Sequence, residues 1–263
     1  HPCTGQEGRR GGIVRRPPWL LADCTRMQRI QLGGIHCTRW SNSRADTVAD
    51  KLSMRVTKAI KAEQLRILRE LYPNAKPALT FKTPFELLIA VILSAQCTDV
   101  RVNVVTGRLF QYANTPEAIA ALGQAALEAE IHDCGFFRMK AKHILETCHI
   151  LMQEYGGEVP ADFEALQKLP GVGRKTANVV MSVAFHAPAI AVDTHVFRVA
   201  NRLHLSVGKT PLEVEKGLQK AIPRADWSDA HHWLILHGRQ LCKARKPHCG
   251  ECPLSPVCPS STE

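Results

Sequence analysis

The sequence contains no apolar run of about 18 residues, the length that a membrane-spanning helix needs. It shows no internal repeat, no convincing strand pattern and no secretory signal. Disulfide frameworks are typical of short secreted chains, so the ten cysteines are expected to be reduced thiols of an intracellular protein. These absences argue against a membrane-spanning helix and favour an all-α fold.

Length and charge leave the choice of function open. A chain of 263 residues with 45% hydrophobic residues can bury one good core or two modest ones. The net charge of +10 suggests an anionic partner, but residues 1–55 hold ten Lys and Arg against four Asp and Glu. The remainder holds 24 against 20, so most of the excess lies in those first residues. Nucleic-acid binding therefore has to be argued from motifs rather than from the isoelectric point.

Residues 1–55 show no sustained periodicity and are rich in Arg, Gly, Cys and Trp. We interpret them as a disordered or extraneous tail, because the chain begins at His1 and Met54 stands just before the first regular element. An Arg-rich, acid-poor leader also fits a mitochondrial transit peptide, so both interpretations stay open.

After this tail, apolar residues recur with helical spacing, and Thr, Asp, Pro and Gly mark the ends of the segments. The helix that starts at Phe85 is apolar nearly all round and is expected to be buried. The pattern predicts helices over residues 57–71, 85–93, 98–112, 124–132, 138–155, 162–168, 174–185, 193–203, 212–222 and 228–240, with a further short one starting at 115.

The most informative stretch is the string LPGVGRKTA from Leu169 to Ala177. It joins two helical patterns by a turn with two glycines, whose backbone can adopt positive φ and lie close against a ligand. Free N–H groups at the start of the second helix attract phosphate. Lys175 lies in that first turn, where the helix dipole is expected to lower its pKa and free its amine as a nucleophile. Asp193 follows eighteen residues later and can cap the next helix.

Turns of this kind are common and a lysine after one is usually solvated, so the turn alone does not establish a function. The whole string, however, resembles the helix-hairpin-helix of DNA repair glycosylases, and the Lys–Asp spacing resembles the endonuclease III family. The resemblance covers about residues 56–258 and implies that Lys175 attacks the deoxyribose while Asp193 assists it. It also implies DNA contacts from the hairpin residues Gly171, Gly173, Arg174 and Thr176.

Four cysteines near the C-terminus have the spacing C-x6-C-x2-C-x5-C. Four thiolates can hold an iron–sulfur cluster or a tetrahedral zinc ion, and the residues alone leave both open. The spacing is similar to the four-iron four-sulfur (4Fe–4S) loop of the endonuclease III family. The resemblance implies a 4Fe–4S cluster on Cys242, Cys249, Cys252 and Cys258. Its role is expected to be structural, because four cysteine ligands leave no open position for substrate.

The loop between the first two of these cysteines carries the cations Lys243, Arg245 and Lys246. Tethered at both ends, this loop is expected to contact DNA phosphates, although a short basic run is often only a solvated surface. The other six cysteines are assigned no role, and Cys97 and Cys148 are expected in the core.

Two further segments resemble the parts of the family that handle a nucleotide flipped out of the duplex, whose gap a side chain fills. The string LSAQCTD, residues 93–99, places Gln96 where the family's glutamine enters that gap. The string CGFF, residues 134–137, places Phe136 where many relatives carry a leucine that wedges beside the orphan base. An exposed helix-end glutamine and a buried aromatic are the plain alternatives.

The resemblance implies a bifunctional DNA glycosylase and abasic-site lyase that acts on double-stranded DNA with oxidised pyrimidines or abasic sites. A Schiff base on the lysine would be followed by β-elimination. A six-helix barrel domain is expected over residues 77–187 and an iron–sulfur domain over 56–76 plus 188–258, with the active-site groove between them. We expect a monomer in the bacterial cytoplasm, associated with the nucleoid.

Three rival functions remain to be weighed. An adenine glycosylase of the same superfamily would carry Ser at position 175, would lack the lyase step and usually has a further C-terminal domain. A non-catalytic helix-hairpin-helix module would need neither Lys175 nor Asp193. An electron carrier built on the cluster would not need the hairpin. The residues present favour the bifunctional enzyme over all three.

Overall fold

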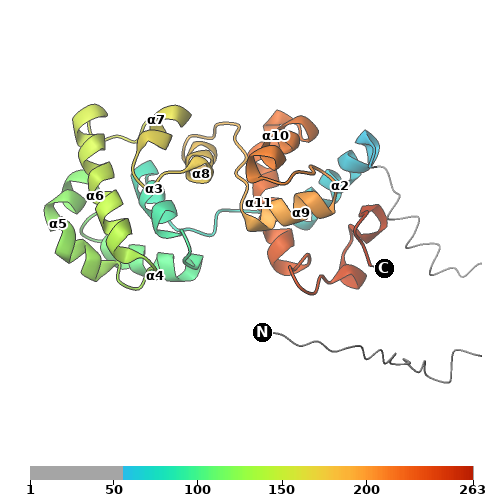
Figure 1. Ribbon diagram of the computed structural model, residues 1–263, viewed down its shortest axis with the longest axis horizontal. Helices are drawn as coiled ribbons and strands as arrows, with labels where there is room; N and C mark the ends of the chain where they lie inside the picture. Colours follow the sequence, from blue (N-terminus) through green and yellow to red (C-terminus); the bar gives the residue numbers. More distant parts are fainter. Residues whose placement is uncertain (1–55, 263) are drawn as a thin grey trace, which may run out of the picture. The chain divides into compact units, whose positions relative to one another are not determined.

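The computed structural model describes residues 56–262, and within that range it contains helices and no strand, as the sequence predicts (Figure 1). None of the described helices combines the length and the apolar character needed to cross a membrane. The interpretation of residues 1–55 as a tail lies outside the described residues.

The helices are α2 (Lys58–Leu71), α3 (Pro84–Leu93), α4 (Asp99–Leu109), α5 (Pro116–Glu130), α6 (Phe137–Glu154), α7 (Phe163–Lys168), α8 (Arg174–Ala184), α9 (Thr194–Arg202), α10 (Pro211–Ala221), η1 (Arg224–Asp226), α11 (Trp227–Gln240), η2 (Cys249–Glu251) and η3 (Ser255–Val257).

Three of these helices begin with the same chemistry, a threonine followed by a proline. Thr83, Thr115 and Thr210 each accept a hydrogen bond of 3.1 to 3.2 Å from the backbone N–H three residues ahead. Proline takes the first helical position, where a missing N–H leaves no partner unsatisfied. Each threonine cap stabilises its helix by roughly 1 kcal/mol, so the helix starts follow directly from the local sequence.

One helix boundary differs from the prediction. The helix expected to reach Tyr112 ends at Leu109. The two short helices expected from residue 115 and over 124–132 are both present within α5, and they meet at Gly123, whose φ of 72° and ψ of 174° are not helical. Positive φ at this glycine redirects the chain between the two helical segments.

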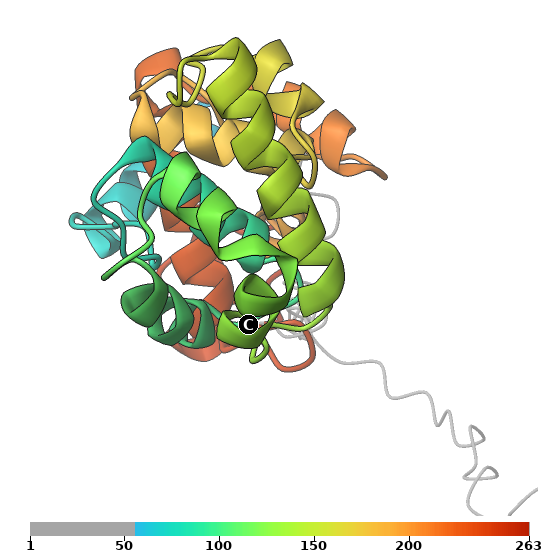
Figure 2. The same cartoon turned by 90° about the vertical axis from the view of Figure 1, so that its left-hand side faces the viewer.

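Buried apolar side chains form two separate cores. Core A runs from Phe85 to Val180 and is built by α3 to α8, of which Figure 2 shows α5 and α6 in green and yellow-green facing the viewer. Core B joins residues 65–72, in α2 and at its C-cap, to residues from Ile190 to Leu254. Figure 1 shows α2, in blue, beside the orange and red helices α9, α10 and α11. The expected division into two domains stays a prediction, which these two cores support.

Polar contacts connect the helices of core A with those of core B. Three of them, each 2.7 Å long, join the pairs Asp99–Arg239, Arg174–Glu215 and Ser182–Ser228. They come from α4 and α8 on one side and from α10 and α11 on the other. These contacts hold together the two surfaces that carry the candidate site.

Candidate functional site

The hairpin between α7 and α8 depends on one glycine. Gly171 has a φ of 76°, in the left-handed region that side chains disfavour. A Cβ atom there would lie 3.3 Å from the His143 Cβ and 3.4 Å from the Ile92 Cγ2, so its neighbours would have to move. Thr147 Oγ1 donates a 3.0 Å hydrogen bond to the Pro170 carbonyl, which fixes the turn onto α6. The turn is therefore held in one conformation by packing as well as by its own backbone.

Gly173 serves a different purpose from Gly171. Its backbone is extended, with φ of −88° and ψ of 176°, so only the first glycine of the motif uses positive φ. A Cβ atom at Gly173 would meet nothing within 4 Å. The residue precedes α8 without capping it by a side chain. Open space and uncapped N–H groups are what a close-lying phosphate requires.

Lys175 and Asp193 line the same two cavities. Lys175 is exposed in the first turn of α8, while Asp193 caps α9 through a 2.7 Å hydrogen bond from the Val196 N–H to Oδ1, as the sequence predicts. The cavities have empty volumes of about 690 and 1320 Å³, counting space open to solvent. In the described part of the chain, Oδ2 of Asp193 takes part in no hydrogen bond. An amine and a carboxylate oxygen from two different helices therefore adjoin one water-accessible space.

A buried histidine lines the smaller cavity beside this pair. The Nδ1 atom of His231 lies 2.8 Å from the Ala191 carbonyl oxygen, which can only accept, so Nδ1 carries the proton. Burial, and then the neighbouring His232, lower the pKa of His231 to about 4. Asp193 opposes this effect and Lys175 adds to it. The imidazole is therefore neutral near pH 7 and brings no positive charge to the amine and carboxylate.

Gln96 lines the larger cavity together with Lys175, whereas Phe136 lies on the neighbouring loop. Both residues adopt left-handed backbone, with φ of 54° and 58°. Such a conformation costs roughly 1–2 kcal/mol for a residue with a side chain. Phe136 is 70% exposed, so the alternative of a buried aromatic is wrong. Nothing in the local sequence signalled the left-handed backbone at either position.

Arg174, expected to contact DNA, is engaged by protein partners. Its guanidinium donates two hydrogen bonds, of 2.7 and 2.9 Å, to the carboxylate of Glu215, which is 3% exposed. The hydrogen bond to Glu215 raises the pKa of Arg174, which also stacks 5.0 Å from the centre of the Phe163 ring. A buried carboxylate needs such a partner, and sequence reasoning did not single out Glu215. DNA contacts from Arg174 and from the half-buried Thr176 stay predictions.

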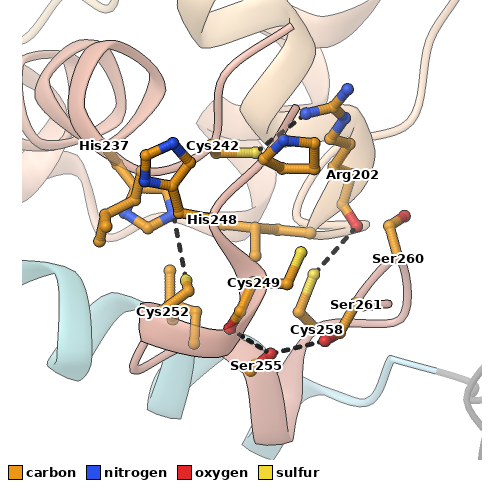
Figure 3. A pocket seen from close by; sticks show the side chains of 14 residues that line it. Arg202, His237, Cys242, His248, Cys249, Cys252, Ser255, Cys258, Ser260 and Ser261 are labelled. Atoms are coloured by element: carbon orange, nitrogen blue, oxygen red, sulfur yellow. Dashed lines mark hydrogen bonds between the residues drawn. The ribbon is translucent and has the colours of Figure 1, made fainter. Parts of the chain in front are cut away.

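The four C-terminal cysteines surround one cavity (Figure 3). They line a space of about 390 Å³, counting the part open to solvent, and none forms a disulfide. In a 4Fe–4S cluster each of four thiolates binds a different iron, so four cysteines around one cavity are a donor set that fits such a cluster.

Two nitrogen-bearing side chains that sequence reasoning missed lie against these sulfurs. The Nε2 atom of His237 is 3.7 Å from the Cys252 Sγ, and Arg202 Nη1 is 3.4 Å from the Cys242 Sγ. Hydrogen bonds of this kind stabilise thiolate ligands and tune a cluster. Burial raises the pKa of Cys258 to about 11, so bound iron is needed to favour its thiolate form.

The basic loop after Cys242 is held by its backbone. Arg202 donates hydrogen bonds of 2.7 and 2.9 Å to the carbonyl oxygens of Lys243 and Ala244. The side chains of Lys243, Arg245 and Lys246 are exposed, as a phosphate contact would require.

The two cysteines expected in the core differ. Cys148 is fully buried, which confirms that expectation. Cys97 packs against core A but is partly exposed and lines the larger cavity, so the expectation of a buried residue is wrong there. The residue follows the left-handed Gln96, which turns the chain toward the surface just before α4.

Comparisons with protein families match two parts of the chain. Residues 89–224 match the HhH-GPD superfamily of base excision DNA repair proteins. Residues 242–258 match the iron–sulfur binding domain of endonuclease III. The second match begins at Cys242 and ends at Cys258, so it coincides with the four-cysteine segment.

Comparisons with individual proteins cover most of the chain. Endonuclease III of Escherichia coli is 51% identical over 203 residues, which are 77% of this chain and 96% of that protein. A structure of a trapped covalent intermediate of endonuclease III with DNA aligns with a TM-score of 0.75 and 50% identity, covering 79% of this chain and 98% of the other. A non-covalent endonuclease III–DNA complex aligns with a TM-score of 0.76 and 49% identity, covering 79% and 97%.

Proposed function

The chain belongs to the endonuclease III family, and on that premise we propose that it is a bifunctional DNA glycosylase and abasic-site lyase. It has the fold of the base excision repair glycosylases and carries a 4Fe–4S cluster. Its proposed substrate is double-stranded DNA that contains an oxidised pyrimidine or an abasic site. Similarity to two DNA-bound structures of endonuclease III supports DNA as the partner.

The observation that carries this proposal is the shared position of Lys175 and Asp193. They lie eighteen positions apart in the sequence, yet both line the same pair of cavities from the starts of α8 and α9. Phosphate binding by a hairpin backbone would need neither side chain. An exposed amine beside a carboxylate oxygen is the arrangement that nucleophilic attack with assisted proton transfer needs.

In the proposed reaction, the neutral amine of Lys175 attacks C1′ of the flipped nucleotide, and the bond from C1′ to the base breaks. The base leaves with the bonding electrons and takes up a proton. Ring opening gives a Schiff base between Nζ and C1′, which acidifies the C2′ proton. Loss of that proton expels the 3′ phosphate, and hydrolysis then frees the lysine.

Asp193 has two possible roles in these steps, and both stay open. Its Oδ2 oxygen can accept the proton of the lysine ammonium, or it can stabilise the cationic Schiff base.

The proposed DNA contacts come from several elements. The uncapped N–H groups after Gly173 and the exposed cations of the basic loop would bind backbone phosphates. Gln96, on the wall of the larger cavity, would fill the gap left by the flipped nucleotide. Phe136, on the adjoining loop, would wedge beside the orphan base.

The 4Fe–4S cluster is proposed to be bound by the four C-terminal cysteines and to act as a structural brace. The helix α9 begins at the cap of Asp193 and ends at Arg202, whose guanidinium holds the basic loop. This one short helix therefore links the position of the carboxylate to that of the cluster loop.

We further propose a monomer with domains over 77–187 and 56–76 plus 188–258, acting on nucleoid DNA as its bacterial relatives suggest.

Borohydride trapping tests the proposal directly. A duplex with a ring-saturated pyrimidine, incubated with the protein and borohydride, should give a covalent protein–DNA adduct together with the free base. Base release without any adduct would indicate a monofunctional glycosylase. Binding without base release would leave only a DNA-binding module, and failure to bind DNA would overturn the proposal altogether.

A further inference from the structure

Two thiols lie where the loops of Gln96 and Phe136 meet. Cys97 directly follows Gln96, and Cys134 precedes Gly135 and Phe136. A Cβ atom on Gly135 would lie 3.6 Å from the carbonyl oxygen of Gln96, so the two loop backbones are in van der Waals contact. Cysteines distant in sequence are thereby brought side by side.

The two thiols differ in access to solvent. Cys134 is fully buried in core A. Cys97 is partly exposed and lines the larger cavity, the same cavity that Lys175 lines. A small reagent that enters this cavity can therefore reach the Cys97 sulfur first. Among the cysteines that the structure describes, Cys134 is the one that interacts with Cys97.

The surroundings of the two thiols agree with Cys97 reacting first and Cys134 second. Burial, followed by the charge of Cys97 and the hydrogen bond that the Cys134 thiol donates to the Cys97 sulfur, raises the pKa of Cys134 to about 11. The ammonium of Lys140, which donates a 2.8 Å hydrogen bond to the Leu93 carbonyl, interacts favourably with both thiols in their charged form. Cys97 is therefore the thiol exposed to attack, and Cys134 is the resolving thiol behind it.

We propose that Cys97 and Cys134 form a reversible disulfide, a modification site that ties together the loops of Gln96 and Phe136. The oxidant is a small disulfide such as glutathione disulfide. The Cys97 thiolate attacks one of its sulfurs and releases a first glutathione thiol. Cys134 then attacks the Cys97 sulfur, releases the second glutathione thiol and completes the bond. Two protein thiols are oxidised, one disulfide is reduced, and both protons pass to glutathione.

The disulfide would change how the protein binds damaged DNA, a consequence that rests on the proposed function. A disulfide requires its sulfurs to approach to about 2.05 Å, which is closer than two separate thiols can stand. The flanking Gln96 and Phe136 have left-handed backbone with little freedom to adjust. Drawing the loops together would displace both side chains from the positions that fill the gap in the duplex.

Peptide mapping of the full chain, treated with glutathione disulfide without oxygen, tests the bond itself. A cross-linked peptide pair containing Cys97 and Cys134 is expected in the wild type and absent in Cys97→Ser. Cys148→Ser, which removes a buried thiol from the same core, should form the cross-link like the wild type. A wild type in which Cys97 stays a mixed disulfide with glutathione, or pairs only with cysteines of residues 1–55, would overturn the proposal.

A second readout tests the effect on DNA and separates it from the proposed function. Affinity for a duplex with an uncleavable abasic analogue should fall several-fold on oxidation and return with dithiothreitol. Cys97→Ser should keep its affinity under oxidant, and absorbance near 400 nm, where iron–sulfur clusters absorb, should stay constant in both proteins. If the cross-link forms and the affinity is unchanged, the link to DNA is wrong. If the protein binds no DNA at all, the peptide map still decides whether the disulfide exists.

Discussion

Two pairs of residues, three of whose members line the larger cavity while Phe136 lies on the neighbouring loop, are held in opposite ways. Lys175 and Asp193 stand at the starts of regular helices, where Asp193 also makes an ordinary helix cap. Gln96 and Phe136 stand between helices, in left-handed backbone that carries a cost of roughly 1–2 kcal/mol each. The helix pair is proposed to do the chemistry and the loop pair to enter the duplex.

The difference between the pairs follows from what each has to do. A nucleophile and its carboxylate partner must keep one geometry through the reaction, which helix starts packed on a core provide. Side chains that enter a duplex must project beyond the protein surface. A residue with left-handed backbone turns the chain sharply, so that its side chain projects from the end of the loop. Backbone strain of this kind often gathers at functional sites.

The largest effect is expected from removing the amine of the helix pair. Lys175→Gln should abolish borohydride trapping on damaged DNA, because no other group then forms the Schiff base. Fold, cluster and most DNA binding should survive, since only an exposed side chain changes. Lys168→Gln, which removes an equal charge from the exposed end of α7, is the matched control and should still trap. An adduct formed by Lys175→Gln would place the nucleophile elsewhere.

A smaller loss is expected at the other member of the helix pair. Asp193→Asn should lower turnover by roughly 10²–10⁴-fold, the range for one proton-transfer group, with little change in DNA affinity. It keeps a side chain that can cap α9, whereas Asp193→Ala should also lose about 1 kcal/mol of unfolding free energy. Turnover measured in single and double variants with Lys175→Gln should show non-additive losses. Equal unfolding free energies for the Asn and Ala variants would show that the cap contributes nothing.

Substitutions at Gln96 of the loop pair should change both the stability of the protein and its affinity for DNA. Gln96→Gly and Gln96→Ala should weaken binding to lesion-containing duplex by similar factors, and more than binding to undamaged duplex. Only glycine relieves the left-handed backbone, so Gln96→Gly should be more stable than Gln96→Ala by about 1 kcal/mol in urea unfolding. Equal stabilities would mean that Gln96 is unstrained, and equal losses on both duplexes would place it outside the lesion site.

The smallest effect concerns the histidine beside the helix pair. His231 has a pKa of about 4 in the folded chain and about 6.5 when unfolded, so the unfolded chain binds more protons between these values. Stability should therefore fall as the pH drops through that window, with at most about 1.4 kcal/mol per pH unit from this group. His231→Asn keeps a donor for the Ala191 carbonyl and does not titrate, so its urea-unfolding free energy should fall less steeply with pH. Parallel profiles would contradict the assignment.

The sequence predicts the helix pair far better than the loop pair. Caps, turn glycines and cysteine spacing are local chemistry, so the residues alone place the starts of α8 and α9 and the four-cysteine loop. Left-handed backbone at Gln96 and Phe136 arises from how neighbouring helices pack, and a glutamine or a phenylalanine carries no sign of it.

Long-range partners were also beyond the reach of the sequence. Glu215 pairs with Arg174 and His231 stands beside Asp193 only because separate helices pack together. A single sequence shows each as an ordinary charged or polar residue on a helix. The same holds for Cys97, whose partial exposure depends on a turn that periodicity does not detect.

The discontinuous core B has a consequence for how the chain comes to be folded during synthesis. Gln64 of α2 donates 2.9 Å hydrogen bonds to the carbonyl oxygens of Leu203 and Val257, which follow it by 139 and 193 residues in the sequence. At 5–20 residues per second, the ribosome would need roughly 10 to 40 seconds to travel from Gln64 to Val257. Core A can fold during this time. The apolar face of α2 remains without its packing partners until they are synthesised. The segment that receives iron is completed last, so the final closure of core B and the loading of the metal fall together in time.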